Sequence, residues 1–535
     1  LCNRFIKELR LAHENIIDVT ISDQNIWLNG SSLTITSSFI GLSSVLNNKN
    51  IKKIIYFIPS EVADSINGME ENLEKGLYCV FNLFKEINRN YKNKIEIIFI
   101  TRYTNKICKT DSIIAENATI VGLGKTARIE NLQLKCRYID IDDYTEVNYL
   151  INEVQSEYCE FIAGYRNNKR YIEYVKQLKS PKHLHNGVLA DNQNIIIAGG
   201  TGGIGDELCR YISKKKKGVN LILISRTERQ IESVDCPVFH YSADISDEHQ
   251  MDQITNAIYQ KFRKVHCVIQ CTSTKNDDAL ANMDLSQFQD AIKSKIKGTR
   301  LLGNIAERVN AEHMILFSSV YALIGGVGAG AYVSSNSYLD SFAYTNQSYS
   351  TITIDWPVWL NIGMAKNETS HSKDLFVPLS VKKATDILEI ALSLEKERLI
   401  VGQINCSVFT DIMQFMPFIL KKEEINKEFS KDTIYEEDFN ESNVLNIISE
   451  IFGSNTIKME DNFFEIGGDS IFALKIINKI AKAFKIKLEI SEFFNHPIIG
   501  DLVNYIMGLK QDINLTIHAL YKIEDKPYYP VSSSQ

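Results

Sequence analysis

Apolar residues in the first 185 positions alternate between short continuous runs and stretches with a helical period. The runs at 51–58 and 95–100 are mostly apolar, as in strands that are covered on both faces of a sheet. Between them, apolar residues recur three or four positions apart, which predicts a helix over 72–88. Residues 1–185 are therefore predicted to form an α/β unit.

The same alternation is more regular in residues 186–412. Apolar runs, most of them separated by helical patterns, are predicted as strands at 194–198, 220–225, 238–243, 266–271, 314–318 and 351–355. Alternation of this kind favours a parallel sheet with helices on both faces. The sequence thus predicts two Rossmann-like α/β units in tandem.

The rest of the chain has a different pattern. Residues 413–440 are rich in lysine and glutamate and lack apolar periodicity, which indicates a linker. Residues 441–508 carry two stretches of helical period, one of them after Ser470, and predict a small all-α domain. Residues 509–535 form a tail that ends in a proline and several serines.

Length, composition and charge exclude several classes of protein. A chain of 535 residues exceeds one hydrophobic core, and 44% hydrophobic with 23% charged residues is typical of globular proteins. The formal charge of −7 argues against nucleic acid as a partner. No apolar run approaches the roughly 18 residues that span a bilayer, so no membrane association is expected.

Cysteine and histidine usage points to a cytoplasmic protein without a metal site. The ten cysteines are scattered and form no Cys-x-x-Cys pair, which favours reduced thiols. The ten histidines do not cluster into a set of ligands. Because the chain begins at Leu1 without an initiator methionine or a signal peptide, we expect it to be a segment of a longer polypeptide.

A glycine-rich turn lies between a predicted strand and a predicted helix, in residues 198–205. Glycines let the backbone approach a pyrophosphate, and the N-terminus of the following helix stabilises its charge. The candidate nucleotide-binding residues of this turn are Gly199, Thr201, Gly202, Gly203, Ile204 and Gly205. Glycine-rich turns without a nucleotide are also common, so the motif alone leaves both interpretations open.

The ends of the next two strands favour NADPH over NADH. An acidic residue after the strand at 220–225 would hold the ribose hydroxyls of NAD, but this chain has Ser225 and Arg226, which suit a 2′-phosphate. Asp244 and Ile245 follow the third strand, where an adenine amino group would lie. The alternative for Arg226 is a solvated surface side chain.

Four further residues are candidates for carbonyl reduction. Ser319 ends the fifth strand, Tyr332 follows thirteen residues later, and Asn336 lies one helical turn beyond it. A tyrosine is a poor acid–base group at neutral pH unless a cation stabilises its phenolate. A simple dehydrogenase would have lysine where Asn336 stands, so Lys295 is the candidate for the missing cation. Taken singly, each residue also has an ordinary structural interpretation as a cap, a packed aromatic, a solvated lysine or a surface amide.

The arrangement resembles the ketoreductase domains of modular polyketide synthases, within the short-chain dehydrogenase/reductase superfamily. The resemblance implies Tyr332 as proton donor, Ser319 as donor to the substrate carbonyl, Lys295 as the cation that lowers the tyrosine pKa, and Asn336 as its partner. It also implies that residues 1–185 are the structural subdomain, because 118–130 and 136–140 look like parts of it. The Gly-Leu-Gly within 118–130 is therefore not expected to be a second nucleotide site.

The string Asp-Asn-Phe-Phe-Glu-Ile-Gly-Gly-Asp-Ser-Ile at 461–471 resembles the attachment site of carrier domains. The resemblance implies a four-helix carrier over 441–508, a 4′-phosphopantetheine arm on Ser470, and a phosphopantetheinyl transferase as partner. An ordinary capped helix is the alternative. Residues 529–535 resemble the opening of a nonribosomal peptide synthetase condensation domain, which implies neighbouring synthase modules as partners.

Two departures from the ketoreductase pattern qualify this prediction. The segment Gln270-Cys271-Thr272-Ser273 replaces the family's usual sequence, and Ser273 stands where a glycine is expected beside the nicotinamide. Asp277 aligns with the aspartate of the B stereochemical type, although a simple loop cap is an equal alternative.

The predicted function is the NADPH-dependent reduction of a carrier-bound 3-oxoacyl thioester, within a polyketide or hybrid polyketide–nonribosomal peptide synthase. The product would then stay on the arm at Ser470. Two alternatives remain open: an inactive ketoreductase scaffold with a functional carrier, and a dehydrogenase that acts on free small molecules.

Overall fold

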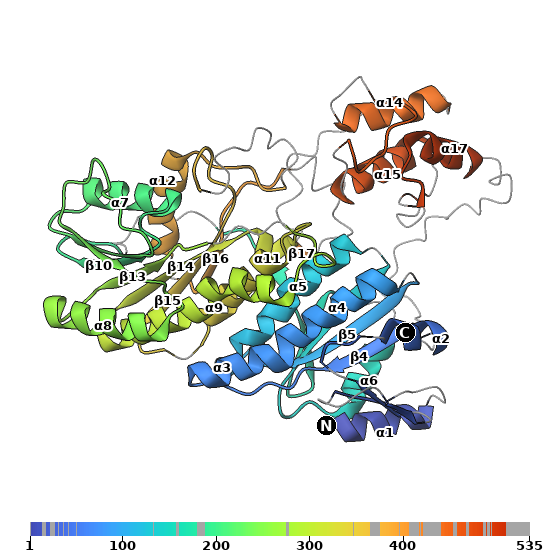
Figure 1. The fold of residues 1–535 in the computed structure, drawn as a ribbon, viewed down its shortest axis with the longest axis horizontal. Helices are drawn as coiled ribbons and strands as arrows, with labels where there is room; N and C mark the ends of the chain where they lie inside the picture. The colour runs from blue at the N-terminus through green and yellow to red at the C-terminus, as the bar shows by residue number, and fades with distance from the viewer. Residues whose placement is uncertain are drawn as a thin grey trace, which may run out of the picture. The chain divides into compact units, whose positions relative to one another are not determined.

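Two large β-sheets and a group of helices make up the computed structural model (Figure 1). It describes residues 37–405 and 440–509, with gaps at 41, 50, 92, 132, 157–159, 179–187, 274–277, 346, 364–374, 395, 453–456, 467–469, 485–487, 489–492 and 494. Outside these ranges it describes 2–12, 18–21, 27–29, 32–35, 417 and 419–420. The chain divides into two units, Leu1–Ser430 with both large sheets and Lys431–Gln535 with helices.

The first large sheet has the strand order β4-β5-β6-β7-β8, parallel except for the antiparallel β8. Its strands are β4 (Lys53–Phe57), β5 (Ile95–Arg102), β6 (Leu134–Ile141), β7 (Ile162–Arg166) and β8 (Lys169–Ile172). The helices of this region are α2 (Leu42–Lys49), α3 (Ile66–Leu73), α4 (Cys79–Asn90), α5 (Ala115–Glu130) and α6 (Val147–Gln155). A π-helical turn, Glu74–Tyr78, joins α3 to α4, so the helix predicted over 72–88 is confirmed within a longer helical segment.

Smaller elements flank this sheet. They are α1 (Cys2–Ala12), β1 (Asp18–Ile21), β2 (Trp27–Asn29), β3 (Ser32–Ile35), β9 (Tyr174–Val175) and β17 (Ile419–Leu420). Strands β1, β3 and β2 form a small sheet of their own, and β9 pairs with β17. The ring of Phe5 in α1 packs edge-on against Phe57, which ties α1 to the large sheet.

The second large sheet is fully parallel, with the order β12-β11-β10-β13-β14-β15-β16. Its strands are β10 (Asn194–Ala198), β11 (Asn220–Ser225), β12 (Val238–Ser242), β13 (Cys267–Gln270), β14 (His313–Ser319), β15 (Ser350–Trp356) and β16 (Arg398–Ile400). Its helices are α7 (Gly203–Lys215), α8 (Glu248–Phe262), α9 (Leu285–Arg308), α10 (Tyr321–Ile324), α11 (Gly330–Phe342) and α12 (Val381–Ser393).

This topology confirms the predicted tandem Rossmann-like fold and locates its site. The strand order changes direction between β10 and β13, and in open parallel sheets ligands bind beyond the carboxyl ends of the strands at such a point. The six predicted strands are all present within one or two residues. The short strand β16 was not predicted, because three residues are too few for a recognisable pattern.

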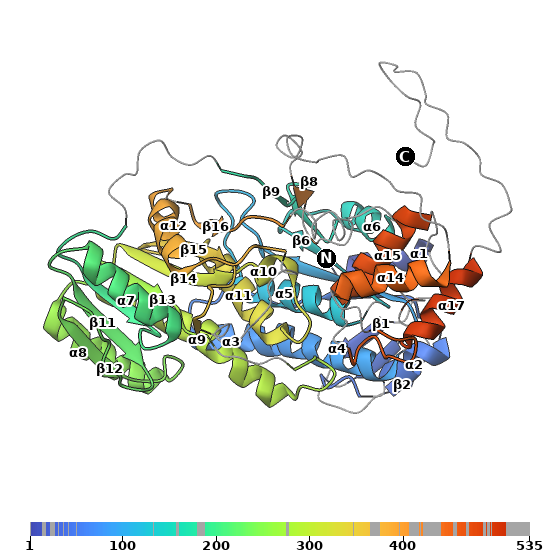
Figure 2. The same cartoon turned by 90° about the horizontal axis from the view of Figure 1, so that it is seen from above.

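Helix α5 of the first region packs directly against α11 of the second, and both views show the two helices side by side (Figure 1, Figure 2). A Cβ on Gly122 would lie 2.6 Å from the Ser337 hydroxyl and 2.9 Å from the Val333 carbonyl oxygen. Nearly every residue of α5 and α11 is buried, so both helices form part of a core shared by the two sheets.

The second unit is helical, as predicted. Among the residues described there, the helices are α14 (Glu441–Phe452), α15 (Ser470–Phe484) and α17 (Ile499–Leu509). Their apolar faces meet in a core that includes Val444, Ile448, Phe463, Ile476 and Leu502. The predicted linker at 413–440 and tail at 509–535 lie almost entirely outside the described residues. None of the described helices is both long and apolar enough to cross a bilayer.

Candidate active site at the carboxyl edge of the second sheet

The glycine-rich turn occupies the change of direction between β10 and β13. Gly199 has φ of +88°, and the Gly202 N–H donates to its carbonyl oxygen over 3.0 Å, which closes a tight turn before α7. A Cβ at Gly205 would lie only 2.2 Å from that same oxygen. The turn therefore needs glycine, and it leads into the N-terminus of a 13-residue helix at the carboxyl edge of the sheet.

The backbone approaches this turn closely from two sides. A Cβ on Gly199 would lie 3.0 Å from the Thr272 nitrogen, and one on Gly203 would lie 2.5 Å from the Gly363 nitrogen. Thr272 follows β13 and Gly363 follows β15, so the turn, the end of β13 and the segment after β15 lie close together at one edge of the sheet. Gly202 and Gly203 remain exposed at the start of α7, where a backbone without side chains suits a dinucleotide pyrophosphate.

Of the two residues predicted near the 2′-phosphate, Ser225 has hydrogen-bond partners within the protein and Arg226 is exposed. The Ser225 hydroxyl lies 2.7 Å from His240 Nε2 and donates to the Thr227 carbonyl over 3.1 Å. Arg226 is exposed at the end of the same strand. In contrast, Arg229 in the loop beyond forms an ion pair with Asp206 of α7.

Asp244 has a local structural role in addition to its predicted place beside the adenine. Its Oδ1 accepts from the Ser246 N–H over 2.9 Å and from the Ser246 hydroxyl over 2.6 Å. Burial alone would raise the pKa of Asp244, but these hydrogen bonds and the positive charges of Lys293 and Arg226 together outweigh it, so the pKa lies below its usual value. Ile245, next in the chain, is buried against Gly298 of α9.

The structure brings Ser319, Tyr332 and Asn336 together. Ser319 ends β14 and is buried, while Tyr332 is partly buried in the first turn of α11. Burial raises the pKa of the Tyr332 phenol, and hydrogen bonds with the Ser319 and Asn336 side chains lower it by less. The ring of Tyr332 also packs edge-on against Tyr321, with 6.2 Å between ring centroids.

Lys295 lies in the same buried region but makes a different contact from the one predicted. Its Nζ donates to the Phe317 carbonyl oxygen over 2.9 Å, two residues before Ser319. Burial lowers the pKa of Lys295 to about 8, against the opposing effects of Cys271 and Asp340. Among the described residues, the groups that shift the Tyr332 pKa do not include Lys295.

Asn336 is positioned by helix α11 itself. Its Nδ2 donates to the Tyr332 carbonyl oxygen over 2.8 Å, which is the contact of residues four apart on one helical face. Its Oδ1 is fully buried and has no hydrogen-bond partner in the described part of the chain. A buried amide oxygen without a donor is costly, so this atom is available to a donor that enters the site.

The unusual segment Gln270–Ser273 begins at the last residue of β13 and comes close to Lys295 at Cys271. Gln270 is fully buried, and its Nε2 donates to the Thr272 hydroxyl over 2.9 Å while Oε1 has no partner among the described residues. Burial raises the pKa of the Cys271 thiol to about 12, and that thiol donates to the Ala198 carbonyl. Ser273 is exposed. Asp277, predicted to influence stereochemistry, lies outside the described residues.

Sequence reasoning missed a buried charge network behind the site. Asp340 of α11 and Asp355 of β15 both contact Arg398, at 2.8 and 2.9 Å. Burial, together with the neighbouring Asp355, raises the pKa of Asp340 well above its usual value. Spacing offered one signal, because Asp340 follows Tyr332 and Asn336 at intervals of four residues and so shares their helical face.

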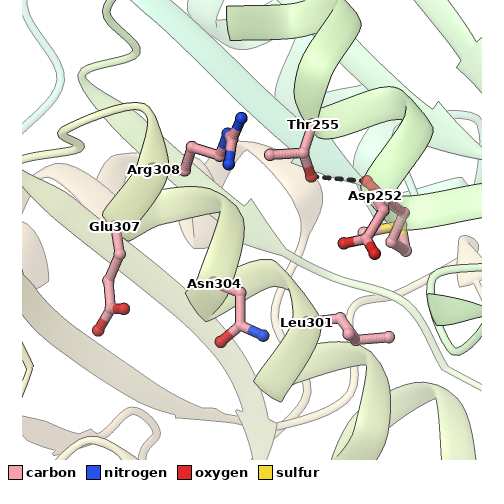
Figure 3. Close-up of a pocket in the computed structure, with 7 residues that line it drawn as sticks. Asp252, Thr255, Leu301, Asn304, Glu307 and Arg308 are labelled. Carbon is pink, nitrogen blue, oxygen red and sulfur yellow. Dashed lines mark hydrogen bonds between the residues drawn. The ribbon is translucent and has the colours of Figure 1, made fainter. Parts of the chain in front are cut away.

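A cavity of about 490 Å³ lies elsewhere, between α8 and the C-terminal half of α9 (Figure 3). It is lined by Met251, Asp252, Thr255, Leu301, Asn304, Glu307 and Arg308. None of the predicted catalytic or nucleotide-binding residues lines it, so it is separate from the candidate site. The described residues also contain no cluster of histidine, cysteine and acidic side chains suited to a metal ion.

The predicted attachment residue begins a helix in the second unit. Ser470 is the first residue of α15, while its side chain and residues 467–469 lie outside what the structure describes. Just before them, Phe463 is fully buried and its N–H donates to the Pro497 carbonyl over 2.7 Å. A helix N-terminus of this kind stabilises a phosphodiester.

The buried amine of Lys295 makes stability depend on pH. Its pKa of about 8 in the folded chain lies below the ordinary 10.5, so unfolding takes up a proton at intermediate pH and stability rises with pH. Between pH 7 and 10, we expect the free energy of unfolding to rise by about 2 to 3 kcal/mol relative to Lys295→Met. Urea titrations of both proteins, followed by tryptophan fluorescence, measure this difference. A difference that stays constant with pH would show that the amine titrates normally.

Three parts of the chain match known protein families. Residues 194–361 match the family described as KR domain, and residues 442–506 match the phosphopantetheine attachment site. Residues 36–157 match the family described as beta-ketoacyl synthase-like, N-terminal. Polyketide synthase PksN of Bacillus subtilis (strain 168) is 23% identical over 71% of this chain, and polyketide synthase PksL of the same organism 22% over 84%. The chain spans only 8% and 11% of the lengths of these two relatives.

Solved structures share the fold. An N-terminal ketoreductase from the macrolactin assembly line has a TM-score of 0.65 and 21% identity, covering 77% of this chain and 86% of its own. A structure with adenylation, ketoreductase and pseudo Asub domains of a keto acid-selecting NRPS module has a TM-score of 0.67 and 19% identity, covering 75% and 37%. Residues 194–361 thus form a KR domain and residues 442–506 a phosphopantetheine attachment domain, in a chain homologous to polyketide synthases.

Proposed function

We propose that this chain reduces a carrier-bound 3-oxoacyl thioester with NADPH and holds the 3-hydroxyacyl product on a phosphopantetheine arm at Ser470. The observation that carries the proposal is the meeting of Ser319, Tyr332 and Asn336 in one buried site, with Lys295 bonded two residues from Ser319. This site and the glycine-rich turn open at the same edge of the second sheet.

The cofactor would lie along the glycine-rich turn. Its pyrophosphate would contact the N-terminus of α7, and its 2′-phosphate would meet Arg226, whose guanidinium suits a phosphate. When bound there, NADPH supplies the hydride that attacks the carbonyl carbon. Gly199 and Gly205 have no side chains that would hold the pyrophosphate away from the backbone.

Tyr332 is the proton donor in this proposal. Its raised pKa keeps the phenol protonated at neutral pH, so the proton is present when the carbonyl oxygen gains negative charge. Ser319 lies within hydrogen-bonding reach of the phenol and donates to the same substrate oxygen. After the transfer, hydrogen bonds from Ser319 and Asn336 stabilise the buried phenolate.

Lys295 and Asn336 complement one another chemically. The amine has three N–H donors, of which Phe317 takes one, and the Asn336 Oδ1 is a buried acceptor without a partner in the described structure. With a pKa of about 8, the amine is mostly protonated at pH 7, and in this proposal it turns from the Phe317 carbonyl toward the phenol. That charge would then favour proton release from Tyr332.

The carrier would deliver the substrate within the same chain. A tethered thioester raises the effective concentration at the reductase, and the arm at Ser470 would then pass the product to a neighbouring module. Loading requires a phosphopantetheinyl transferase, and the resemblance of residues 529–535 makes a condensation domain the proposed next partner. The cytoplasm, where thiols stay reduced, is the proposed location.

An inactive reductase scaffold is the second candidate, and the segment after β13 favours it. Ser273 stands where the resemblance to ketoreductase domains implies a glycine, and the neighbouring Gln270 leaves Oε1 buried without a partner among the described residues. A side chain near the nicotinamide would reduce turnover without disturbing the fold.

Intact-mass spectrometry of acyl-loaded protein decides between these candidates. A 3-oxoacyl group loaded on Ser470 should gain two hydrogens when NADPH is added, and Tyr332→Phe should slow this gain by about 100-fold or more because the acid is lost. Ser470→Ala serves as the loading control and should take up no arm. Loading without any gain of hydrogen, together with intact NADPH binding, would favour the scaffold.

Cofactor choice has its own test in Arg226→Ala. Loss of a charged contact to the 2′-phosphate should weaken NADPH binding by about 10- to 100-fold and leave NADH binding nearly unchanged. Arg229→Ala is the matched control, because Arg229 lies in the same loop but pairs with Asp206. Fluorescence titration measures both affinities. Equal losses for the two cofactors in Arg226→Ala would contradict the assignment of NADPH.

A further inference from the structure

The connection between Ser319 and Tyr332 is held from outside the catalytic sheet. It consists of the one-turn helix α10 and a bend whose Gly325 and Gly328 have φ of +82° and +69°. Val327 within the bend is 53% exposed. A short segment of this kind has little core of its own, so its conformation depends on neighbouring contacts.

Lys125 of α5 holds the first half of this connection. Its Nζ donates to the Ala322 carbonyl oxygen over 2.6 Å, and its side chain is buried. A Cβ on Gly325 would lie 2.8 Å from the Lys125 carbonyl oxygen, so the bend fits tightly against the helix.

Glu130, the last residue of α5, holds the second half. Its Oε1 accepts from the Gly328 N–H and its Oε2 from the Leu280 N–H, each over 2.9 Å. Gly328 lies four residues before Tyr332, and Leu280 belongs to the segment between β13 and α9. One carboxylate therefore joins two segments that border the candidate site.

Leu280 packs where these segments meet. It is fully buried, and a Cβ on Gly330 would lie 2.5 Å from its Cδ2 and 3.4 Å from Leu123 of α5. The first turn of α11, which carries Tyr332, thus rests on Leu280 and on α5. The Leu280 side chain packs against α11 and α5, while its backbone N–H donates to Glu130.

Lys125 and Glu130 have unusual hydrogen-bond partners for charged side chains. Lys125 is buried and Glu130 half-buried, and charged side chains in such places normally pair with an opposite charge, yet the described structure contains no ion pair of either residue. Their hydrogen bonds go instead to backbone groups of the segments around the site. Burial lowers the pKa of Lys125 and raises the pKa of Glu130, and the bonds from the Leu280 and Gly328 N–H groups oppose the shift at Glu130. Hydrogen bonds between such side chains and backbone groups fix the position of the backbone.

We propose that Lys125 and Glu130 are positioning residues of the reductase. They hold the connection from Ser319 to Tyr332 and the backbone at Leu280, and so set the geometry in which a substrate carbonyl meets the phenol. The inference rests on the proposed ketoreduction and extends it. It gives the first α/β region a part in catalysis beyond support of the fold.

Glu130→Gln in the whole chain tests the proposal. The amide keeps one acceptor but presents an N–H₂ group to the other backbone N–H, so one bond is lost with little change in volume. We expect kcat/KM for an N-acetylcysteamine 3-oxobutanoyl thioester to fall about 10- to 100-fold, with NADPH affinity unchanged, because the glycine-rich turn does not contact Glu130. Hydrogen exchange at Gly328 and Leu280 should speed up by a similar factor.

Glu116→Gln is the matched control. Glu116 is a buried carboxyl at the other end of α5 and interacts with Asn72 rather than with the segments around the site. This variant should keep kcat/KM within about twofold of the unmodified chain even if it melts at a lower temperature. Lys125→Met, which removes the bond to Ala322 with little change in volume, should reproduce the effect of Glu130→Gln on kcat/KM.

Two results would overturn the inference. One is a Glu130→Gln variant whose kcat/KM and whose hydrogen exchange at Gly328 and Leu280 both equal those of the unmodified chain. The other is an equal loss of activity in Glu116→Gln, which would show that the fall in kcat/KM of Glu130→Gln comes from a general loss of stability. If the unmodified chain does not reduce the thioester at all, the proposed function fails, and exchange at Gly328 and Leu280 still decides whether Glu130 fixes these segments.

Discussion

The close packing of α5 against α11 is the constraint on which the rest of the structure depends. A side chain at Gly122 would collide with Ser337 and with the Val333 carbonyl, so the two helices can lie this close only because small residues face one another. Helix α11 carries Tyr332, Asn336 and Asp340, and its position fixes theirs. The two sheets therefore act as one body around the site, although only the second has the topology of a nucleotide-binding sheet.

Burial shifts the pKa values of Tyr332 and Lys295, the proposed proton donor and its cation, in opposite directions. It raises the pKa of Tyr332, which favours the protonated phenol, and lowers that of Lys295 to about 8, which weakens its hold on a positive charge. A dry site strengthens each remaining hydrogen bond, so the contacts of Ser319 and Asn336 with the phenol gain in importance. An ionised Asp340 would oppose the lowering of the Lys295 pKa, but burial raises the pKa of Asp340 itself and so limits this effect.

The sequence was sufficient to predict the sheets and the grouping of Ser319, Tyr332 and Asn336, because apolar runs and helical spacing are local signals. It could not predict that the Lys295 amine would bond to Phe317, since that contact depends on the depth of α9 against β14. The roles of Lys125 and Glu130 were also hidden, because their partners are backbone groups about 150 to 200 residues away. The network of Asp340, Asp355 and Arg398 was hidden for a similar reason, because its members come from three separate elements.

A crystal structure of the chain with NADPH is the most direct test of the proposed reduction. We expect the nicotinamide to lie beside Tyr332, the pyrophosphate to follow the turn at Gly199–Gly205, and the Lys295 amine to reach within hydrogen-bonding distance of Asn336 Oδ1 or the phenol. A nicotinamide excluded by the segment at Gln270–Ser273, with the amine still bonded only to the Phe317 carbonyl and turned away from Tyr332, would contradict it.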